Sequence, residues 1–155
     1  MLIRCLKPSD RAEWLRMRCA LWPDGEDDHE LEIGDYFHQN ERKAAVFVVD
    51  RGNGILGGFI EASIRYYADG CDTRNVGYIE GWYVDPDLRL QSLGRRLVAA
   101  AEQWAREQGC REMASDCELS NEISLQAHLA IGYEEVERAI HFRKLLEGET
   151  IWTKS

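Results

Sequence analysis

Three arginines gather where an apolar, strand-like segment gives way to a helix-like one. The segment 78–84 is followed by Pro86, and then by Arg89, Arg95 and Arg96. The first N–H groups of a helix have no intrahelical acceptor, so they point out of the helix start together. Such a start binds anions through these groups and through the helix dipole. With the added positive charge, this position predicts a site for a phosphorylated cofactor.

The helix after this turn is predicted from an amphipathic pattern. Its apolar positions recur at helical spacing, and they are Leu93, Leu97, Ala101, Trp104 and Ala105. Gly109 supplies the expected stop at the C-terminal end. A glycine-containing turn before a helix is also consistent with simple chain reversal, so the turn alone does not name a ligand.

A second motif lies further along the chain. It has the spacing Asn-x-x-Ser-x-x-Ala-His-x-x-x-Gly-Tyr, formed by Asn121, Ser124, Ala127, His128, Gly132 and Tyr133. Together with the arginine-flanked turn, it resembles the GNAT superfamily of acetyl-CoA-dependent N-acetyltransferases over nearly the whole chain. The resemblance implies that the turn binds the CoA pyrophosphate. Arg89 and Gly94 fit the superfamily pattern Arg/Gln-x-x-Gly-x-Gly/Ala, and Ser92 stands where the first glycine is usual.

The serine adds a Cβ near the phosphate path, which puts the local backbone geometry in question. Its hydroxyl can donate a hydrogen bond in return. The resemblance also implies which residues contact acetyl-CoA. They are Trp82, Tyr83, Val84, Arg89, Leu90, Gln91, Ser92, Leu93, Gly94, Arg95, Arg96 and Asn121.

Five further segments are similar to the short aminoglycoside 6'-N-acetyltransferases, the antibiotic-modifying branch of that superfamily. They are residues 21–24, 61–66, 79–84, 114–116 and 137–138. Five separated matches in register are more specific than one glycine turn. One departure is His141-Phe142, where that group more often has Tyr-Phe. The resemblance implies transfer of acetyl to the 6'-amine of an aminoglycoside in a ternary complex, with no covalent acyl-enzyme, and antibiotic resistance as its result.

The strand 76–84 is expected to border the cofactor. Strict alternation places Tyr78, Glu80, Trp82 and Val84 on one face, and Gly81 invites a bulge. In GNAT proteins that bulge parts the fourth and fifth strands and leaves a V-shaped slot for the pantetheine arm. The resemblance therefore implies that backbone groups at 82–84 pair with pantetheine and that one N–H polarises the thioester carbonyl. Gly81 is also consistent with packing in an ordinary strand.

Two carboxylates are the candidates for acid–base chemistry. A protonated amine must lose a proton before it attacks a thioester, so a carboxylate has to bind the ammonium and accept or relay that proton. Asp116 is predicted at the end of the fifth strand, beside the slot, although short aspartates also serve as turn or cap residues there. Glu80 lies between aromatic residues, and a solvent-facing strand carboxylate is the alternative for it.

Two histidines are weaker candidates for the acid that protonates the departing thiolate. His128 occupies the position where many GNAT enzymes have a tyrosine, and histidine titrates near neutrality. His141 lies on a predicted strand near the acceptor end, where it could contact substrate. A structural role is equally consistent with either residue.

The acceptor pocket is expected to be aromatic and acidic. Trp22, Tyr66 and Tyr67 are candidate walls for sugar rings, and Asp24 is a candidate contact for the amines of the substrate. The predicted substrate-binding set therefore comprises Trp22, Asp24, Tyr66, Tyr67, Glu80, Asp116 and His141. A core tryptophan and a solvated run of charge are the alternatives for the helix region.

Composition agrees with a small globular enzyme. The chain has 155 residues, with 45% hydrophobic and 30% charged, and its 28 acidic against 19 basic side chains give a net charge of −9. This charge argues against binding to nucleic acid or an anionic membrane and favours a polycationic small molecule.

The five cysteines form no Cys-x-x-Cys pair, so neither a disulfide framework nor a metal site is expected. No signal-peptide or membrane-length apolar run is present, so a cytoplasmic location is expected.

These patterns predict one α/β domain over residues 1–146 and a C-terminal tail at 147–155, in which Trp152 is a candidate partner contact. Strands are expected at 2–6, 44–50, 55–65, 76–84, 112–117 and 135–145. The resemblance implies the GNAT fold: a mixed, mostly antiparallel, twisted sheet of six to seven strands with about four helices and a V-shaped opening between strands 4 and 5. It also implies a homodimer. An acetyltransferase for another amine, such as a polyamine or a protein N-terminus, and a non-catalytic CoA-binding module remain alternatives.

Overall fold

The computed structural model describes residues 1–39 and 43–147. Within these ranges the chain forms five strands and four α-helices, with short 3-10 turns at Pro8–Asp10 and Pro86–Leu88. The elements are β1 (Leu2–Cys5), α1 (Arg11–Leu21), α2 (Glu26–His38), β2 (Ala44–Gly52), β3 (Ile55–Arg65), β4 (Val76–Val84), α3 (Leu93–Glu107), β5 (Met113–Ser115) and α4 (Glu122–Ala130). Trp152 lies outside the described residues, as does all of the predicted tail except Glu147.

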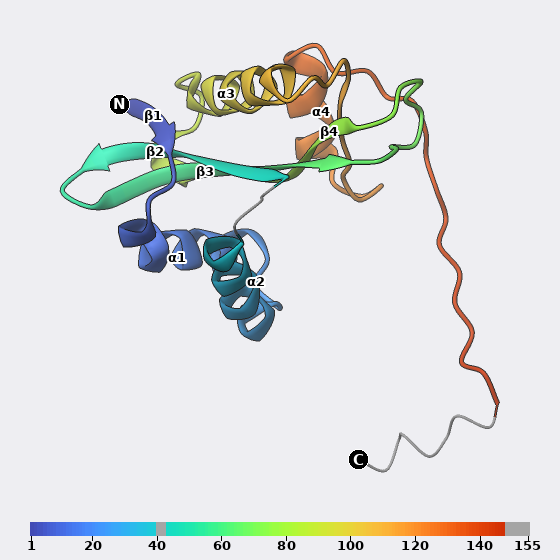
Figure 1. Ribbon diagram of the computed structural model, residues 1–155, viewed down its shortest axis with the longest axis horizontal. Helices are drawn as coiled ribbons and strands as arrows, with labels where there is room; N and C mark the ends of the chain where they lie inside the picture. Colours follow the sequence, from blue (N-terminus) through green and yellow to red (C-terminus); the bar gives the residue numbers. More distant parts are fainter. Residues whose placement is uncertain (40–42, 148–155) are drawn as a thin grey trace.

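The strands form one sheet in the order β1-β2-β3-β4-β5. The first four are antiparallel neighbours, and β4 and β5 run parallel. Helices α1 and α2 lie on one side of the sheet, and α3 and α4 lie on the other (Figure 1). Each pair of helices therefore covers a different face of the sheet, and the hydrophobic core has two layers, one on each face.

The two core layers follow from the apolar patterns of the helices. Helix α3 buries Leu93, Leu97, Val98, Ala101 and Ala105 against β2, β3 and β4, as its amphipathic pattern predicts. The other layer joins Trp14, Met17 and Ile33 from the first two helices to Val46, Val48, Leu56 and Phe59 of the sheet. Burial of a large apolar side chain is worth about 1.5–3 kcal/mol, so these layers hold the sheet between its helices. No helix in the described ranges is both long and apolar enough to cross a membrane.

The sequence predicted most elements well and the end of the chain poorly. Strands β3 and β4 have the expected bounds, whereas β5 is shorter than the expected strand at 112–117. The expected strand at 135–145 is wrong, because these residues are extended, exposed and unpaired within the described chain. The sheet therefore has five described strands in place of the six to seven expected. A strand exists only where a partner accepts its hydrogen bonds, and the described chain offers this segment none.

A bulge interrupts β4 where Gly81 predicted one. Glu61 of β3 pairs with Gly81 and the next residue, Ala62, pairs with Ile79, so Glu80 is the extra residue. The expectation that alternate residues from 78 to 84 share one face is consequently wrong. Trp82 packs with Ile79 in the layer beneath α3, and a Cβ at Gly81 would overlap the indole of Trp22 on the opposite face.

Candidate active site

The two central strands part beside the bulge. Their pairing runs from Gly77 with Met113 to Ile79 with Ser115, where β5 ends, while β4 continues to Val84. The outer edge of β4 beyond Ile79 therefore has no strand partner among the described residues. This is the predicted opening between the fourth and fifth strands, and on this edge it leaves the backbone groups of residues 80–83 without a strand partner among the described residues.

A second element of the site is the start of α3. Ser92 has φ 66° and Leu90 has φ 64°, so both residues take the left-handed conformation that glycine adopts most easily. The serine is thus held in the geometry that a glycine would supply, at an energetic cost. The first intrahelical bond runs from the Arg96 N–H to the Ser92 carbonyl at 3.0 Å, so the N–H groups of residues 93–95 precede the helical pattern. They are the donors that an anion would use.

Ion pairs fix the segment that leads into this turn. Asp85 is buried at the end of β4 and accepts hydrogen bonds from Arg16 at 3.1 Å and Arg51 at 3.0 Å. Burial opposes ionisation of this carboxyl, yet the two guanidinium groups hold its pKa below the usual value. No sequence motif indicated this anchor, because the arginines that bind Asp85 come from α1 and β2.

The three arginines of the turn do not converge on one point. Arg89 donates from Nε to the Val84 carbonyl at 2.9 Å and stays exposed. Arg95 donates to the Ala130 carbonyl at the end of α4, and Arg96 donates to the Met1 carbonyl. Each keeps further N–H groups, so the turn remains positively charged. Only Arg89 is bonded to the strand that borders the opening.

The helix start lies directly against the opening. A Cβ at Gly94 would approach the indole of Trp82 at 3.3 Å, so the glycine permits this close contact. Trp82 meets the ring of His128 edge to face at 5.4 Å between centroids. His128 shares hydrogen bonds with the Ser124 carbonyl through Nδ1 (2.7 Å) and with Ser115 Oγ through Nε2 (2.8 Å). The structure therefore brings the α3 start, Trp82 and His128 together around the end of β5.

The two candidate carboxylates are held by residues that sequence reasoning missed. The Tyr78 hydroxyl donates a hydrogen bond to Asp116 Oδ2, and burial, together with this bond, raises the pKa of Tyr78. Arg65 contacts both oxygens of Glu80, at 2.9 and 2.6 Å, and its guanidinium lies 3.5 Å from the centre of the Tyr78 ring. One arginine thus links the two carboxylates through the tyrosine. The predicted acid pair is in this way joined into one group by hydrogen bonds and a cation–π contact.

The remaining predicted substrate contacts lie at different depths. Trp22 is partly buried, packed over Gly81 and beside Phe59 and His29, so part of its indole belongs to the core. Asp24 and the two tyrosines Tyr66 and Tyr67 are exposed. Trp22 therefore reaches β4 next to the bulge, whereas the tyrosines stand at the start of the loop 66–75.

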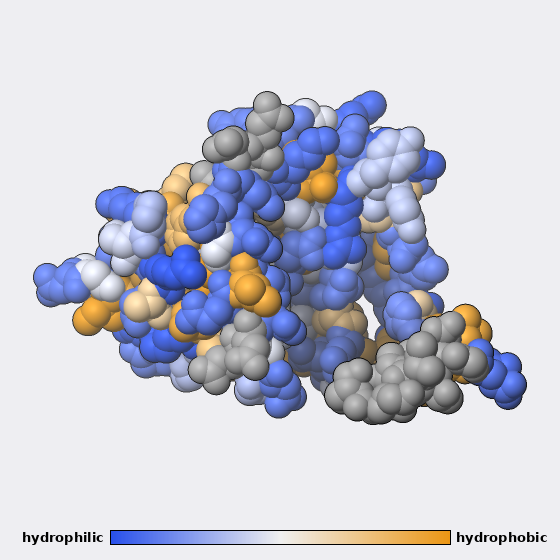
Figure 2. Space-filling view, turned by 60° about the horizontal axis from the view of Figure 1, so that its bottom comes forward, coloured by the Kyte–Doolittle hydropathy of each residue, from blue (hydrophilic) through white to orange (hydrophobic). Residues whose placement is uncertain are grey.

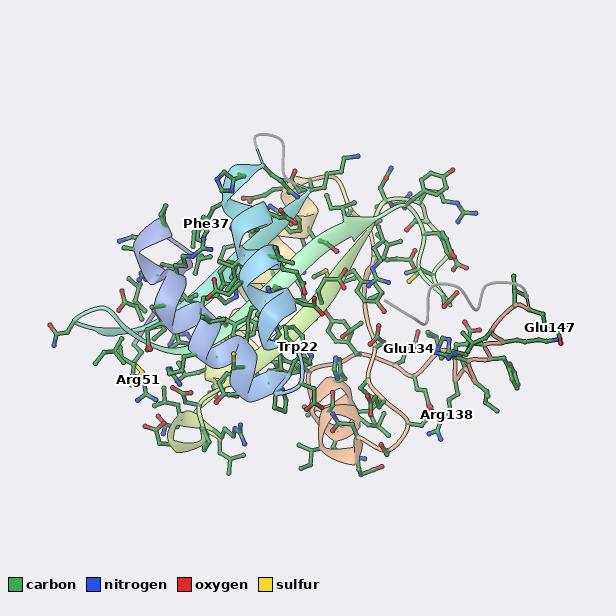
Figure 3. The ribbon with its side chains drawn as sticks, turned by 90° about the horizontal axis from the view of Figure 1, so that it is seen from below. Trp22, Phe37, Arg51, Glu134, Arg138 and Glu147 are labelled. Atoms are coloured by element: carbon green, nitrogen blue, oxygen red, sulfur yellow. The ribbon has the colours of Figure 1, made fainter. Side chains whose placement is uncertain are left out.

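Two predicted residues are placed apart from the rest. Asn121 caps α4 by accepting a hydrogen bond from the Ser124 N–H at 3.1 Å, so its side-chain oxygen already has a structural task. His141 lies on the exposed segment that leads away from the body and makes no hydrogen bond within the described chain. Figure 3 shows this segment running from Glu134 past Arg138 to Glu147. His141 does not contact Asp116 or Glu80 of its own chain.

The residues that sequence reasoning missed are Tyr78 and Arg65, and strand periodicity was the one sequence signal for them. Alternation put Tyr78 on the same strand face as Glu80, and it put Ser63 and Arg65 on one face of the neighbouring strand. The described residues hold no group of three or more His, Cys, Asp or Glu side chains suited to a metal ion. The carboxylates, the histidine and the helix start that are present can support proton transfer and hydrogen bonding to an anion.

A parted strand pair beside a helix start that can bind an anion is the arrangement expected of an acyltransferase that uses a nucleotide-bearing thioester. The family model described as "Acetyltransferase (GNAT) family" matches residues 10–133. The chain belongs to this family and is an acetyl-CoA-dependent acetyltransferase with the GNAT fold.

Several relatives carry a more particular name. The chain is similar to "Aminoglycoside N(6')-acetyltransferase type 1" of Klebsiella aerogenes, with 48% identity over 94% of this chain and 97% of the relative. The protein of the same name from Salmonella enteritidis is 39% identical over 93% of this chain and 99% of the relative.

Solved structures agree with these relatives. AAC(6')-Iy in complex with the bisubstrate analog CoA-S-monomethyl-acetylneamine has a TM-score of 0.84 and 36% identity, covering 94% of this chain and 98% of that one. The aminoglycoside antibiotic 6'-N-acetyltransferase AAC(6')-Ih from Acinetobacter baumannii has a TM-score of 0.86, 36% identity and the same coverage.

Proposed function

We propose that this acetyltransferase transfers acetyl from acetyl-CoA to the 6'-amino group of aminoglycoside antibiotics, and so confers resistance to them. The observation that carries the proposal is the pair of carboxylates, Glu80 and Asp116, held beside the parted strands. An acidic site suits a polycationic amine, since unlike charges attract most strongly where water is partly excluded. The names of the relatives support the same substrate class.

The cofactor is held by its phosphates and its pantetheine arm. The N–H groups at the start of α3 and the free guanidinium nitrogens of Arg89 receive the pyrophosphate. The unpaired edge of β4 at residues 82–84 pairs with pantetheine and presents one N–H to the thioester carbonyl. Gly94 keeps the helix start close to Trp82 and therefore close to that arm.

Asp116 is the favoured base. Its Oδ2 accepts the Tyr78 hydroxyl, and its Oδ1 has no partner among the described residues. Both oxygens of Glu80 already accept hydrogen bonds from Arg65. Asp116 therefore has a free oxygen for the ammonium proton, directly or through water, whereas Glu80 contributes negative charge that attracts the substrate.

The reaction is a direct attack in a ternary complex. The neutral amine nitrogen forms the new bond to the acetyl carbon and then releases its second proton to solvent. The carbon–sulfur bond breaks, and the departing thiolate takes a proton from an acid. His128 is the proposed donor of that proton, since its ring lies beside Trp82 and the end of β5. The enzyme acts as a cytoplasmic homodimer.

A thiol-release assay with kanamycin and acetyl-CoA tests the proposal. Free CoA should accumulate only when both substrates are present. Release with a polyamine or a peptide, and none with kanamycin, would favour the alternative of an acetyltransferase for another amine. Binding of acetyl-CoA without release for any amine would indicate a CoA-binding module.

A further inference from the structure

A buried histidine holds the turn between α1 and α2. His29 is 3% exposed, and its Nε2 lies 2.9 Å from the carbonyl oxygen of Trp22. A carbonyl oxygen can only accept a hydrogen bond, so Nε2 is the donor here. The Gly25 N–H donates to the same carbonyl at 3.3 Å, and the His29 N–H donates to the Gly25 carbonyl at 2.9 Å. The turn from Trp22 to His29 is therefore closed by its own hydrogen bonds.

The rings of His29 and Trp22 also contact each other. Their centroids are 5.8 Å apart, with 30° between the ring planes. Gly25 leaves room for this contact, because an added Cβ there would lie 3.3 Å from Cε1 and Nε2 of the imidazole. Figure 3 places Trp22 at this turn, and Figure 2 shows mostly hydrophilic side chains over the two helices. His29 thus contacts Trp22 beneath that surface, both at the backbone and at the indole.

Packing alone does not account for a histidine at this position. Its Nδ1 is buried and has no hydrogen-bond partner among the described residues. A buried nitrogen without a partner is costly, so an apolar side chain would fill the same space at a lower cost. The polar contact that His29 makes within the described chain is the bond to the Trp22 carbonyl. Control of Trp22 is therefore what the imidazole provides and an apolar side chain would not.

The other contacts of Trp22 direct its indole to the bulge of β4. A Cβ at Gly81 would overlap Cη2 of the indole, so the edge of the ring lies directly over this glycine. Phe59 meets the indole at 6.3 Å between centroids, and the guanidinium of Arg18 lies 5.2 Å from the centre of the indole. Glu80, the extra residue of the bulge, precedes Gly81 in the chain. The indole is thus fixed next to the residue whose carboxylate is proposed to attract the substrate.

We propose that His29 is a positioning residue of the acceptor site, which holds the indole of Trp22 in place before a substrate binds. Trp22 is only partly buried, so the part of its indole outside the core can contact a ligand. A flat ring with a large apolar surface suits the apolar face of a sugar. A wall that is already ordered spares the substrate the cost of ordering it. That the ligand is the sugar carrying the 6'-amine rests on the proposed function, whereas the hold of His29 on Trp22 does not.

The first test observes Trp22 in the free enzyme by fluorine NMR. The protein is labelled with 5-fluorotryptophan, and Trp22→Phe assigns the Trp22 resonance. His29→Phe keeps a ring and removes the donor, so this resonance should broaden or split as the indole takes several positions. His29→Gln keeps an N–H donor at a similar reach, so its Trp22 resonance should stay single and sharp. The resonances of Trp82 and Trp104 should be unchanged in both variants, which shows that the fold is intact.

Two results of this experiment would overturn the proposal. A single sharp Trp22 resonance in His29→Phe would show that the indole is held without the histidine. Broadening in both His29→Phe and His29→Gln would show that the hydrogen bond is not what holds it.

The second test is steady-state kinetics with kanamycin. His29→Phe should raise the KM for kanamycin about threefold to tenfold, the cost of ordering one side chain on binding, with kcat and the KM for acetyl-CoA little changed. His29→Gln should restore the KM. His38→Phe is the matched control, because His38 bonds to the Gly34 carbonyl at 2.7 Å at the opposite end of α2, and its loss should change neither constant. Equal losses for both substrates in His29→Phe would indicate a structural role only and overturn the proposal.

Gly25→Ala moves His29 without removing it. The added Cβ crowds the imidazole, and the φ of Gly25, −114°, suits any residue. Gly25→Ala should raise the KM for kanamycin when His29 is present and raise it no further in His29→Phe, since the hold on Trp22 is already lost. Additive effects of the two substitutions would contradict a route through His29. If kanamycin is not acetylated, the proposed function fails, and the fluorine spectra of the free enzyme still decide the role of His29.

Discussion

The hydroxyl of Tyr78 donates a hydrogen bond to the carboxylate of Asp116, across the pair of strands that part to form the site. A tyrosine hydroxyl is already protonated at neutral pH, and burial raises the pKa of Tyr78 further, so the hydroxyl acts as a donor. The bond leaves the other oxygen of Asp116 without a partner among the described residues, and it fixes the side chain of a residue that lies just past β5. Tyr78 is therefore a positioning residue for the proposed base.

Tyr78→Phe should lower kcat about tenfold, since a hydrogen bond to a charged group is worth about 1.5–3 kcal/mol and part of that is recovered by water. The KM for acetyl-CoA should be little changed. Tyr133→Phe is the matched control, because it removes a similar bond, from Tyr133 to Glu102 at 2.7 Å, outside the proposed acid–base group. Equal losses of kcat in both variants would show that Tyr78 has only a structural role.

Asp116→Asn should lower kcat by roughly 10²-fold or more, the usual contribution of a general base. Acetyl-CoA affinity, measured by calorimetric titration, should stay close to that of the unmodified enzyme. The variant Glu80→Gln is the comparison, and it should raise the KM for the aminoglycoside more than it lowers kcat. If Asp116→Asn turns over normally, the role of base passes to Glu80 or to water.

Arg89→Ala and Gly94→Val should both weaken acetyl-CoA binding, for different reasons. The first removes a guanidinium next to the helix start, and the second forces side-chain atoms into Trp82. Arg106→Ala, at the opposite end of α3, controls for the loss of one positive charge on the same helix. Unchanged affinity in both test variants, by calorimetry, would remove the helix start from the account.

Ser92→Gly should stabilise the protein by up to about 1 kcal/mol, because the left-handed backbone conformation costs an ordinary residue roughly this much. The greater freedom of glycine in the unfolded chain offsets part of the gain. Binding of acetyl-CoA should be retained, since the backbone geometry already fits. Denaturant unfolding measures the first effect and calorimetry the second. A less stable Ser92→Gly variant would mean that the hydroxyl has a role not seen in the described contacts.

The sequence predicted those features that local patterns encode. The helical spacing of α3 and the bounds of β3 and β4 follow from hydrophobic periodicity, and Gly81 indicated the bulge before β4 and β5 part. Periodicity could not reveal that the bulge moves Trp82 to the face of α3, because a register shift is set by pairing with β3. The fold was therefore predictable except where one strand depends on its neighbour.

The contacts that unite the site were beyond the sequence. Tyr78 and Asp116 are 38 residues apart in the sequence, and His128 contacts Ser115 from α4, which follows β5 after a loop. The residue types indicated which groups could act as acid and base, but they did not indicate the hydrogen-bond partners of these groups. The predicted strand at 135–145 failed for another reason: its pattern is that of a strand, but the described chain offers no partner for it.

Mass spectrometry of the product tests the central claim most directly. Kanamycin or tobramycin incubated with the enzyme and acetyl-CoA should gain one acetyl group, and a matched aminoglycoside with a hydroxyl at the 6' position should be a far poorer substrate. Fragmentation should place the acetyl group on the 6' nitrogen. An unmodified aminoglycoside, alongside ready acetylation of a polyamine or a peptide, would contradict the proposed substrate and assign the enzyme to another amine within the same family.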